Sequence, residues 1–115
     1  MGVDINCISG IGIKINDPIE IIEKLKIECE KDEDGDFSNV DDTLYGYNDI
    51  LYNSNIKISY GGGWYGGNHS YFILIDDLFK NGIDKVQETI NVFIEWLKNN
   101  NFDTNVSEIS FSFYD

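Results

Sequence analysis

The residues with the clearest chemical potential are carboxylates gathered in one short stretch. Between Glu28 and Asp42 the sequence holds eight carboxylates and a single lysine, Lys31. Such a segment cannot pack into an apolar core, because a buried carboxylate without a partner is very costly. The acidic loop, residues 30–43, must therefore face water, a metal ion or a partner. The acidic residues expected to contact a partner are Glu30, Asp32, Glu33, Asp34, Asp36, Asp41, Asp42 and Asp49.

Part of the acidic loop is similar to the calcium-binding loop of an EF-hand. Placing Gly35 at the turn position of that motif puts Glu30 at its first position and Asp41 at its last. Both ends depart from the motif, because the first position is usually Asp and the last usually a bidentate Glu. A surface that binds a protein partner is therefore the preferred interpretation, with no cofactor. The alternative is a calcium site whose ligands would be Asp32, Asp34, Asp36 and Asp41.

The second unusual feature is a glycine-rich segment, residues 61–67, that carries Trp64 and Tyr65. Exposed Trp and Tyr side chains are typical of binding hot spots, so both are predicted to contact a partner. Alternatively, Trp64 folds back over the core as a lid. A phosphate-binding loop is disfavoured, because such loops usually open onto a helix and include a lysine.

Catalytic groups are sparse. His69 is the only histidine, and the nearest following carboxylates, Asp76 and Asp77, stand at the other end of a predicted strand. Nothing in the sequence places Cys7 or Cys29 beside the imidazole. We expect His69 to be structural or simply exposed, and the protein to be a binding protein rather than an enzyme.

Apolar periodicity indicates which elements position these groups. The predicted strands are residues 3–15 (bent near Gly10 and Gly12), 56–60, 71–75 and 109–113. The predicted helices are residues 17–30 and 83–97, with a weaker one at 44–52. This order is that of the ferredoxin-like split βαβ fold, an α+β fold with a four-stranded antiparallel sheet and two helices on one face. Serines alternating with phenylalanines in the last strand indicate that the other face is wet. Residues 1–115 are expected to form a single domain.

Charge narrows the class of partner. The chain has 21 acidic residues against 8 basic ones, a net charge of −13. This charge repels phosphate backbones, which argues against direct nucleic-acid binding, and it attracts basic protein surfaces. The sequence has no apolar run long enough for a membrane span and no signal-peptide pattern, so a cytoplasmic location is expected. Abundant isoleucine and asparagine suggest an AT-rich genome, that of a low-GC bacterium or its phage.

These observations predict a stoichiometric inhibitor that imitates the charge of nucleic acid. It would occupy the basic surface of a nucleic-acid-binding protein or effector complex, with aromatic side chains as anchors. Small acidic proteins of this kind include phage anti-restriction and anti-CRISPR proteins and nuclease-immunity proteins, which the chain resembles in size, charge and composition alone. The alternative function is a small-ligand or nucleotide-binding module built on the glycine-rich segment. An exposed edge strand could also pair with a second copy to form a homodimer.

Overall fold

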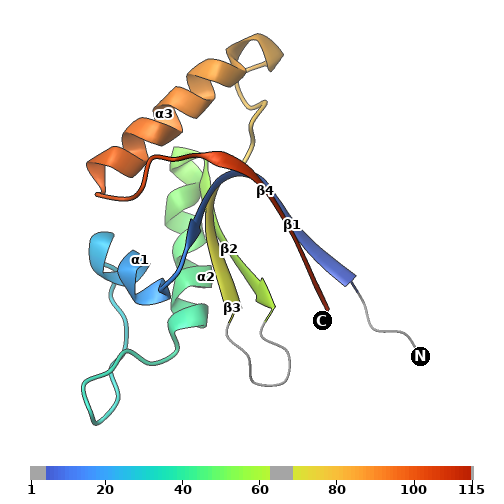
Figure 1. Cartoon of the computed structure of the whole chain (residues 1–115). Coiled ribbons are helices and arrows are strands. Elements are labelled where there is room, and N and C mark those ends of the chain that lie inside the picture. Colours follow the sequence, from blue (N-terminus) through green and yellow to red (C-terminus); the bar gives the residue numbers. More distant parts are fainter. Residues whose placement is uncertain (1–4, 63–68, 115) are drawn as a thin grey trace.

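The computed structural model describes residues 5–62 and 69–114. The fold is α+β, with a four-stranded antiparallel sheet and three α-helices (Figure 1). In chain order the elements are β1 (Ile5–Ile15), α1 (Pro18–Lys24), α2 (Val40–Leu51), the 3-10 turn η1 (Tyr52–Ser54), β2 (Ile56–Gly62), β3 (His69–Ile75), the 3-10 turn η3 (Ile83–Lys85), α3 (Val86–Asn99) and β4 (Ser107–Tyr114). All four predicted strands are confirmed. The weaker helix predicted at residues 44–52 is also confirmed, as α2. No helix of the described segments has the length and apolar character needed to cross a membrane.

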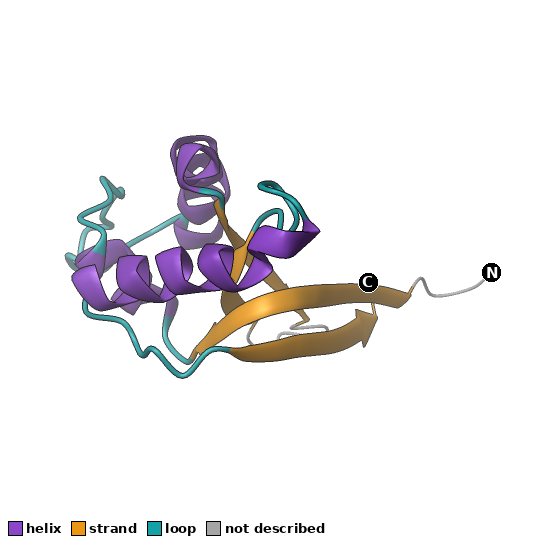
Figure 2. Ribbon diagram, turned by 90° about the horizontal axis from the view of Figure 1, so that it is seen from above, coloured by secondary structure: helices purple, strands orange, loops and turns teal. Residues whose placement is uncertain are grey.

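The sheet has the strand order β2-β3-β1-β4, and its two halves are joined through β1. The first part of β1 pairs with β4 and the last part pairs with β3. Gly12 is the residue at which the pairings meet, since it lies opposite both Leu74 and Ser107. The long β1–β4 ribbon therefore swings away from the β2–β3 hairpin, as Figures 1 and 2 show. This is the bend that the glycines predict.

Helix α1 begins as predicted but ends early. The Asp17 side chain accepts a hydrogen bond from the backbone N–H of Ile19, and Pro18 occupies the first helical position. The prediction that the helix reaches Glu30 is wrong. Lys26 adopts a left-handed conformation (φ 54°) and Ile27 N–H bonds back to the carbonyl of Ile22, which closes the helix.

One face of the sheet carries the main core. Side chains of β1, β2 and β3 on this face pack against all three helices, with Ile22 of α1, Leu44 of α2 and Leu97 of α3 almost fully buried. The helices therefore share one face of the sheet (Figure 2), but they are three where the ferredoxin-like order predicted two, because both α1 and α2 lie between β1 and β2.

The opposite face is only partly wet, which corrects the prediction made from the serines of the last strand. Phe111 and Phe113 of β4 lie on this face and pack with a second buried cluster that contains Phe72. The exposed Ser110 and Ser112 lie instead on the face that carries the helices, because they pair with Ser9 and Cys7 of β1. The packing of the phenylalanines is possible because a glycine on β2 leaves room, since a Cβ at Gly61 would lie 2.4 Å from the Phe113 ring. The sheet thus curls so that β4 covers part of its second face.

Candidate functional site

The acidic loop folds as a tight hairpin rather than an EF-hand loop. Lys31 and Phe37 form an isolated antiparallel bridge, and the Lys31 ammonium lies 5.2 Å from the centre of the Phe37 ring. The N–H of Gly35 (φ 85°) donates to the carbonyl of Asp32 at 3.1 Å, and Asp32 N–H donates to Asp36 at 2.8 Å. This is a type I turn followed by a left-handed glycine, a common three-residue hairpin loop. It points Glu33 and its acidic neighbours into solvent.

Within this hairpin the Asp32 carboxylate accepts hydrogen bonds from the backbone. Its Oδ1 accepts hydrogen bonds from the N–H groups of Asp34 at 2.9 Å and Asp36 at 3.0 Å. Asp41, which the EF-hand comparison places at the end of the loop, instead lies in the first turn of α2. In the described part of the chain, no three His, Cys, Asp or Glu side chains gather in a way that could hold a metal ion.

A second group of carboxylates gathers where the acidic loop meets α2. Glu28, Glu30 and Asp42 line an open hollow of about 660 Å³, with Asn39 between them. The Asn39 amide donates to Oε2 of Glu30 at 3.1 Å, which ties the loop to the start of the helix. These carboxylates are exposed, so the negative charge here faces outward.

Asp41 connects α2 to the start of β3. Its Oδ2 lies 2.7 Å from Nδ1 of His69, and its Oδ1 accepts a hydrogen bond from the Tyr71 hydroxyl at 2.5 Å. An ionised carboxylate has no proton to give, so Nδ1 of His69 is the donor and its Nε2 is left as an acceptor when the ring is neutral. This contact orients the imidazole and sets which ring nitrogen carries the proton in its neutral form.

Aromatic rings surround this hydrogen-bonded pair. Tyr60 stacks on His69 with ring centres 5.3 Å apart, and lies 5.8 Å from the ring of Tyr71. Burial raises the pKa of Tyr71, and the hydrogen bond to Asp41 raises it further. Burial also raises the pKa of Tyr60, with smaller contributions from the charges of Asp41 and Asp42. The acidic start of α2 therefore lies beside the partly exposed Tyr60 of β2, while Tyr71 of β3 is buried beneath them.

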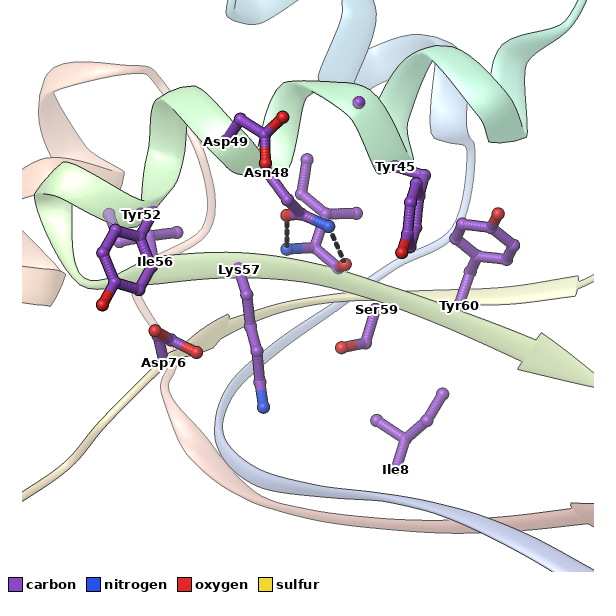
Figure 3. Close-up of a pocket in the computed structure, with 12 residues that line it drawn as sticks. Ile8, Tyr45, Asn48, Asp49, Tyr52, Ile56, Lys57, Ser59, Tyr60 and Asp76 are labelled. Atoms are coloured by element: carbon purple, nitrogen blue, oxygen red, sulfur yellow. Dashed lines mark hydrogen bonds between the residues drawn. The ribbon is translucent and has the colours of Figure 1, made fainter.

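A groove of about 760 Å³ extends this surface between α2 and β2 (Figure 3). Tyr45, Asp49 and Tyr52 line it from the helix side, at intervals of four and three residues that place them on one face. Tyr60 and Lys57 line it from β2. The groove is thus rich in tyrosine and carries charges of both signs.

Asn48 holds α2 against the edge of the sheet. Its Oδ1 accepts a hydrogen bond from the N–H of Ile58 at 2.7 Å, and its Nδ2 donates to the Ile58 carbonyl at 3.0 Å (Figure 3). The strand order makes β2 an edge strand. The amide of Asn48 therefore occupies backbone groups that a neighbouring strand would otherwise take.

The acidic residues predicted to contact a partner fall into three places. Glu33, Asp34 and Asp36 lie at the hairpin of the acidic loop, Glu30 and Asp42 at the hollow, and Asp49 in the groove. Asp32 and Asp41, by contrast, are engaged in hydrogen bonds within the chain. Trp64 and Tyr65 lie outside the described residues.

Sequence reasoning missed the tyrosines of the groove and the partner of His69. The pairing of Asp41 with His69 joins residues 28 positions apart, and no local pattern links them. Tyr45 and Tyr52 did carry a signal, because their spacing with Asp49 places them on one face of the weaker predicted helix. Comparison with protein-family models, curated proteins and solved structures finds no match for the chain.

Proposed function

We propose that this protein is a small acidic binding protein that inhibits a nucleic-acid-handling protein or complex stoichiometrically. The observation that carries the proposal is the continuity between exposed carboxylates and tyrosines. Glu28, Glu30 and Asp42 line the hollow at the start of α2, and Asp42 shares a helix face with Tyr45 and Asp49, which line the groove. Carboxylates steer a basic surface into contact, and desolvated aromatic rings slow its release.

The partner in this proposal is a basic cleft that normally holds nucleic acid. A net charge of −13 on 115 residues presents many negative groups to such a cleft. Carboxylates in place of the phosphates of nucleic acid present the same sign of charge to such a cleft. The protein would act in the cytoplasm of a bacterial or phage-infected cell, as a counter-defence protein such as an anti-CRISPR or anti-restriction factor, or as a nuclease-immunity protein.

We further propose that the fold is a variant of the ferredoxin-like split βαβ arrangement. The central positions of β1 and β3 and the antiparallel β2–β3 hairpin support this assignment. The departure is an additional helix, since both α1 and α2 connect β1 to β2.

A small-ligand or nucleotide-binding module is the second candidate. The groove volume of about 760 Å³ lies in the range of small-molecule sites. However, Asp49 and Asp76 both line the groove and would repel a phosphate. The binding of a basic protein surface is therefore favoured.

The test is capture followed by competitive elution. The protein is immobilised and exposed to a bacterial lysate, and retained proteins are eluted with duplex DNA or RNA at constant ionic strength. The proposal predicts that nucleic acid releases nucleic-acid-binding proteins, since both compete for one cleft. Retained proteins that nucleic acid fails to displace would contradict it. A rise in melting temperature with nucleotides in place of such capture would favour the second candidate.

A matched pair of variants shows whether the hollow is responsible. The first combines Glu28→Gln, Glu30→Gln and Asp42→Asn, and so removes the charge of the hollow. The control combines Asp84→Asn, Glu95→Gln and Glu108→Gln, exposed positions on η3, α3 and β4. Both change the net charge equally. Only the first should lose capture.

A further inference from the structure

We propose that the groove between α2 and β2 receives an arginine side chain of the partner. This inference rests on the proposed function, which supplies the basic partner, and adds the chemistry of one contact. The guanidinium would stack on Tyr45 and Tyr60, with the Asp49 carboxylate as its charge partner.

The first support is the exposure and placement of the tyrosines. Tyr45 is 70% exposed and Tyr52 is 66% exposed, unusually open for large aromatic side chains on a helix. Figure 3 shows the rings of Tyr45 and Tyr60 side by side, one from α2 and one from β2. A planar guanidinium binds well against aromatic faces, more so than the compact ammonium of lysine.

The second support is charge. Asp49 and Asp76 line the groove against a single lysine, Lys57, which Figure 3 shows extending from β2 on the side of Asp76. One end of the groove already holds a cation against a ring, because Nζ of Lys80 lies 5.9 Å from the centre of Tyr52. A guanidinium in the groove would likewise have ring faces, those of Tyr45 and Tyr60, and in addition the carboxylate of Asp49.

The third support is the blocked strand edge. Asn48 occupies both the N–H and the carbonyl of Ile58 on β2. An extended peptide could not pair its backbone with β2 at this position without displacing that amide. The contact in this groove is therefore made by a side chain.

The probe is a hexa-arginine peptide compared with a hexa-lysine peptide, titrated into the full chain at about 150 mM salt, where exposed charges are largely screened beyond ~8 Å. Binding is followed by heteronuclear NMR of the backbone amides. We expect hexa-arginine to shift the amides of Tyr45, Asp49 and Tyr60, and to bind about fivefold more tightly than hexa-lysine. Equal binding of the two peptides, or shifts confined to the acidic loop, would overturn the proposal.

Variants separate the groove from general charge. Asp49→Asn and Tyr45→Ala should each weaken hexa-arginine binding about threefold or more. Asp84→Asn, on η3, changes the net charge as much as Asp49→Asn and should leave the affinity unchanged. Both altered side chains in the groove are exposed, so neither substitution should unfold the protein. If Asp49→Asn and Asp84→Asn weakened hexa-arginine binding equally, net charge alone would explain the effect and the proposal would be wrong.

The outcomes distinguish this inference from the function on which it rests. If the groove variants keep the captured partner while neutralising the hollow abolishes capture, the proposed function stands and the groove contact is wrong. If hexa-arginine binds the groove but nucleic acid displaces no captured protein, the groove contact stands and the nucleic-acid-like role is wrong.

Discussion

The carboxylate of Asp41 and the imidazole of His69 are joined by a 2.7 Å contact between α2 and β3. The same carboxylate accepts the hydroxyl proton of Tyr71. A single side chain thus fixes the acidic start of α2 to the sheet, next to the tyrosines of the proposed binding surface. The rigidity of that surface should depend on this side chain.

The first prediction tests this tether. Asp41→Ala leaves His69 and Tyr71 without their shared partner and should lower the free energy of unfolding by about 1–3 kcal/mol. Asp42→Ala is the matched control, because it removes the same charge from the same helical turn, where it should cost less than about 1 kcal/mol. Urea denaturation measures both. Equal losses would mean that only the helix-terminal charge matters.

The second prediction concerns alkaline pH. The pKa of Tyr71 is raised in the folded protein by burial and by its bond to Asp41, and that of Tyr60 is raised as well. The folded state therefore holds these protons more tightly than the unfolded state, in which tyrosine titrates near pH ~10. Their contribution to stability is fully present below that pH and is lost as the pH rises above it.

Urea denaturation at a series of pH values on both sides of pH ~10 checks this dependence. Tyr71→Phe removes one of the two groups, so its stability should fall less steeply with pH. The exposed Tyr45 provides the control substitution, Tyr45→Phe. If the stability of Tyr71→Phe fell with pH as steeply as that of Tyr45→Phe, the raised pKa of Tyr71 would be contradicted.

The third prediction concerns the glycine at which β1 changes partner. A Cβ at Gly12 would lie 2.0 Å from the backbone oxygen of Ile73, so one of the two strands must move to accept it. Gly12→Ala should therefore destabilise the protein by about 3 kcal/mol or more. Gly46→Ala, in an exposed part of α2 with no heavy atom within 4 Å of the added Cβ, should instead stabilise it by about 0.5–1 kcal/mol. Thermal unfolding followed by circular dichroism should show a lower melting temperature for Gly12→Ala and a higher one for Gly46→Ala than for the native chain.

The elements that follow local rules were predictable. Alternation at Ile56, Ile58 and Tyr60 predicted β2, and the Asp17–Pro18 pair predicted where α1 begins. The end of α1 was not predictable from periodicity. Apolar residues continue at helical spacing to Cys29, which packs against the main core from an irregular segment. Apolar residues at helical spacing alone do not distinguish a continued helix from an irregular segment that packs against the core.

The candidate site was predictable only in part. The composition of the acidic loop identified it as a candidate site, and its exposure follows from the cost of burying charge. The link between Asp41 and His69 depends on how α2 packs against the sheet, which no local pattern encodes. The comparison of the acidic loop with an EF-hand failed to anticipate the hairpin, because Asp-rich turns with a glycine suit both structures.

The fourth prediction concerns the protected edge of the sheet. Asn48→Ala removes two hydrogen bonds and leaves the N–H and carbonyl of Ile58 without partners, which should cost about 2 kcal/mol. It also frees the β2 edge for pairing with another copy. Sedimentation velocity should then detect more self-association than the native chain and the exposed control Asn53→Ala show. A monomeric and fully stable Asn48→Ala protein would show that the edge needs no protection.

The most direct test of the acidic binding surface is a calorimetric comparison of three proteins against the captured partner. These are the native chain, the variant neutralised at Glu28, Glu30 and Asp42, and the variant neutralised at Asp84, Glu95 and Glu108. The account predicts one-to-one binding that weakens about tenfold or more in the first variant and stays near the native value in the second. Equal affinities for the two variants would show that the hollow at the start of α2 is not the binding surface.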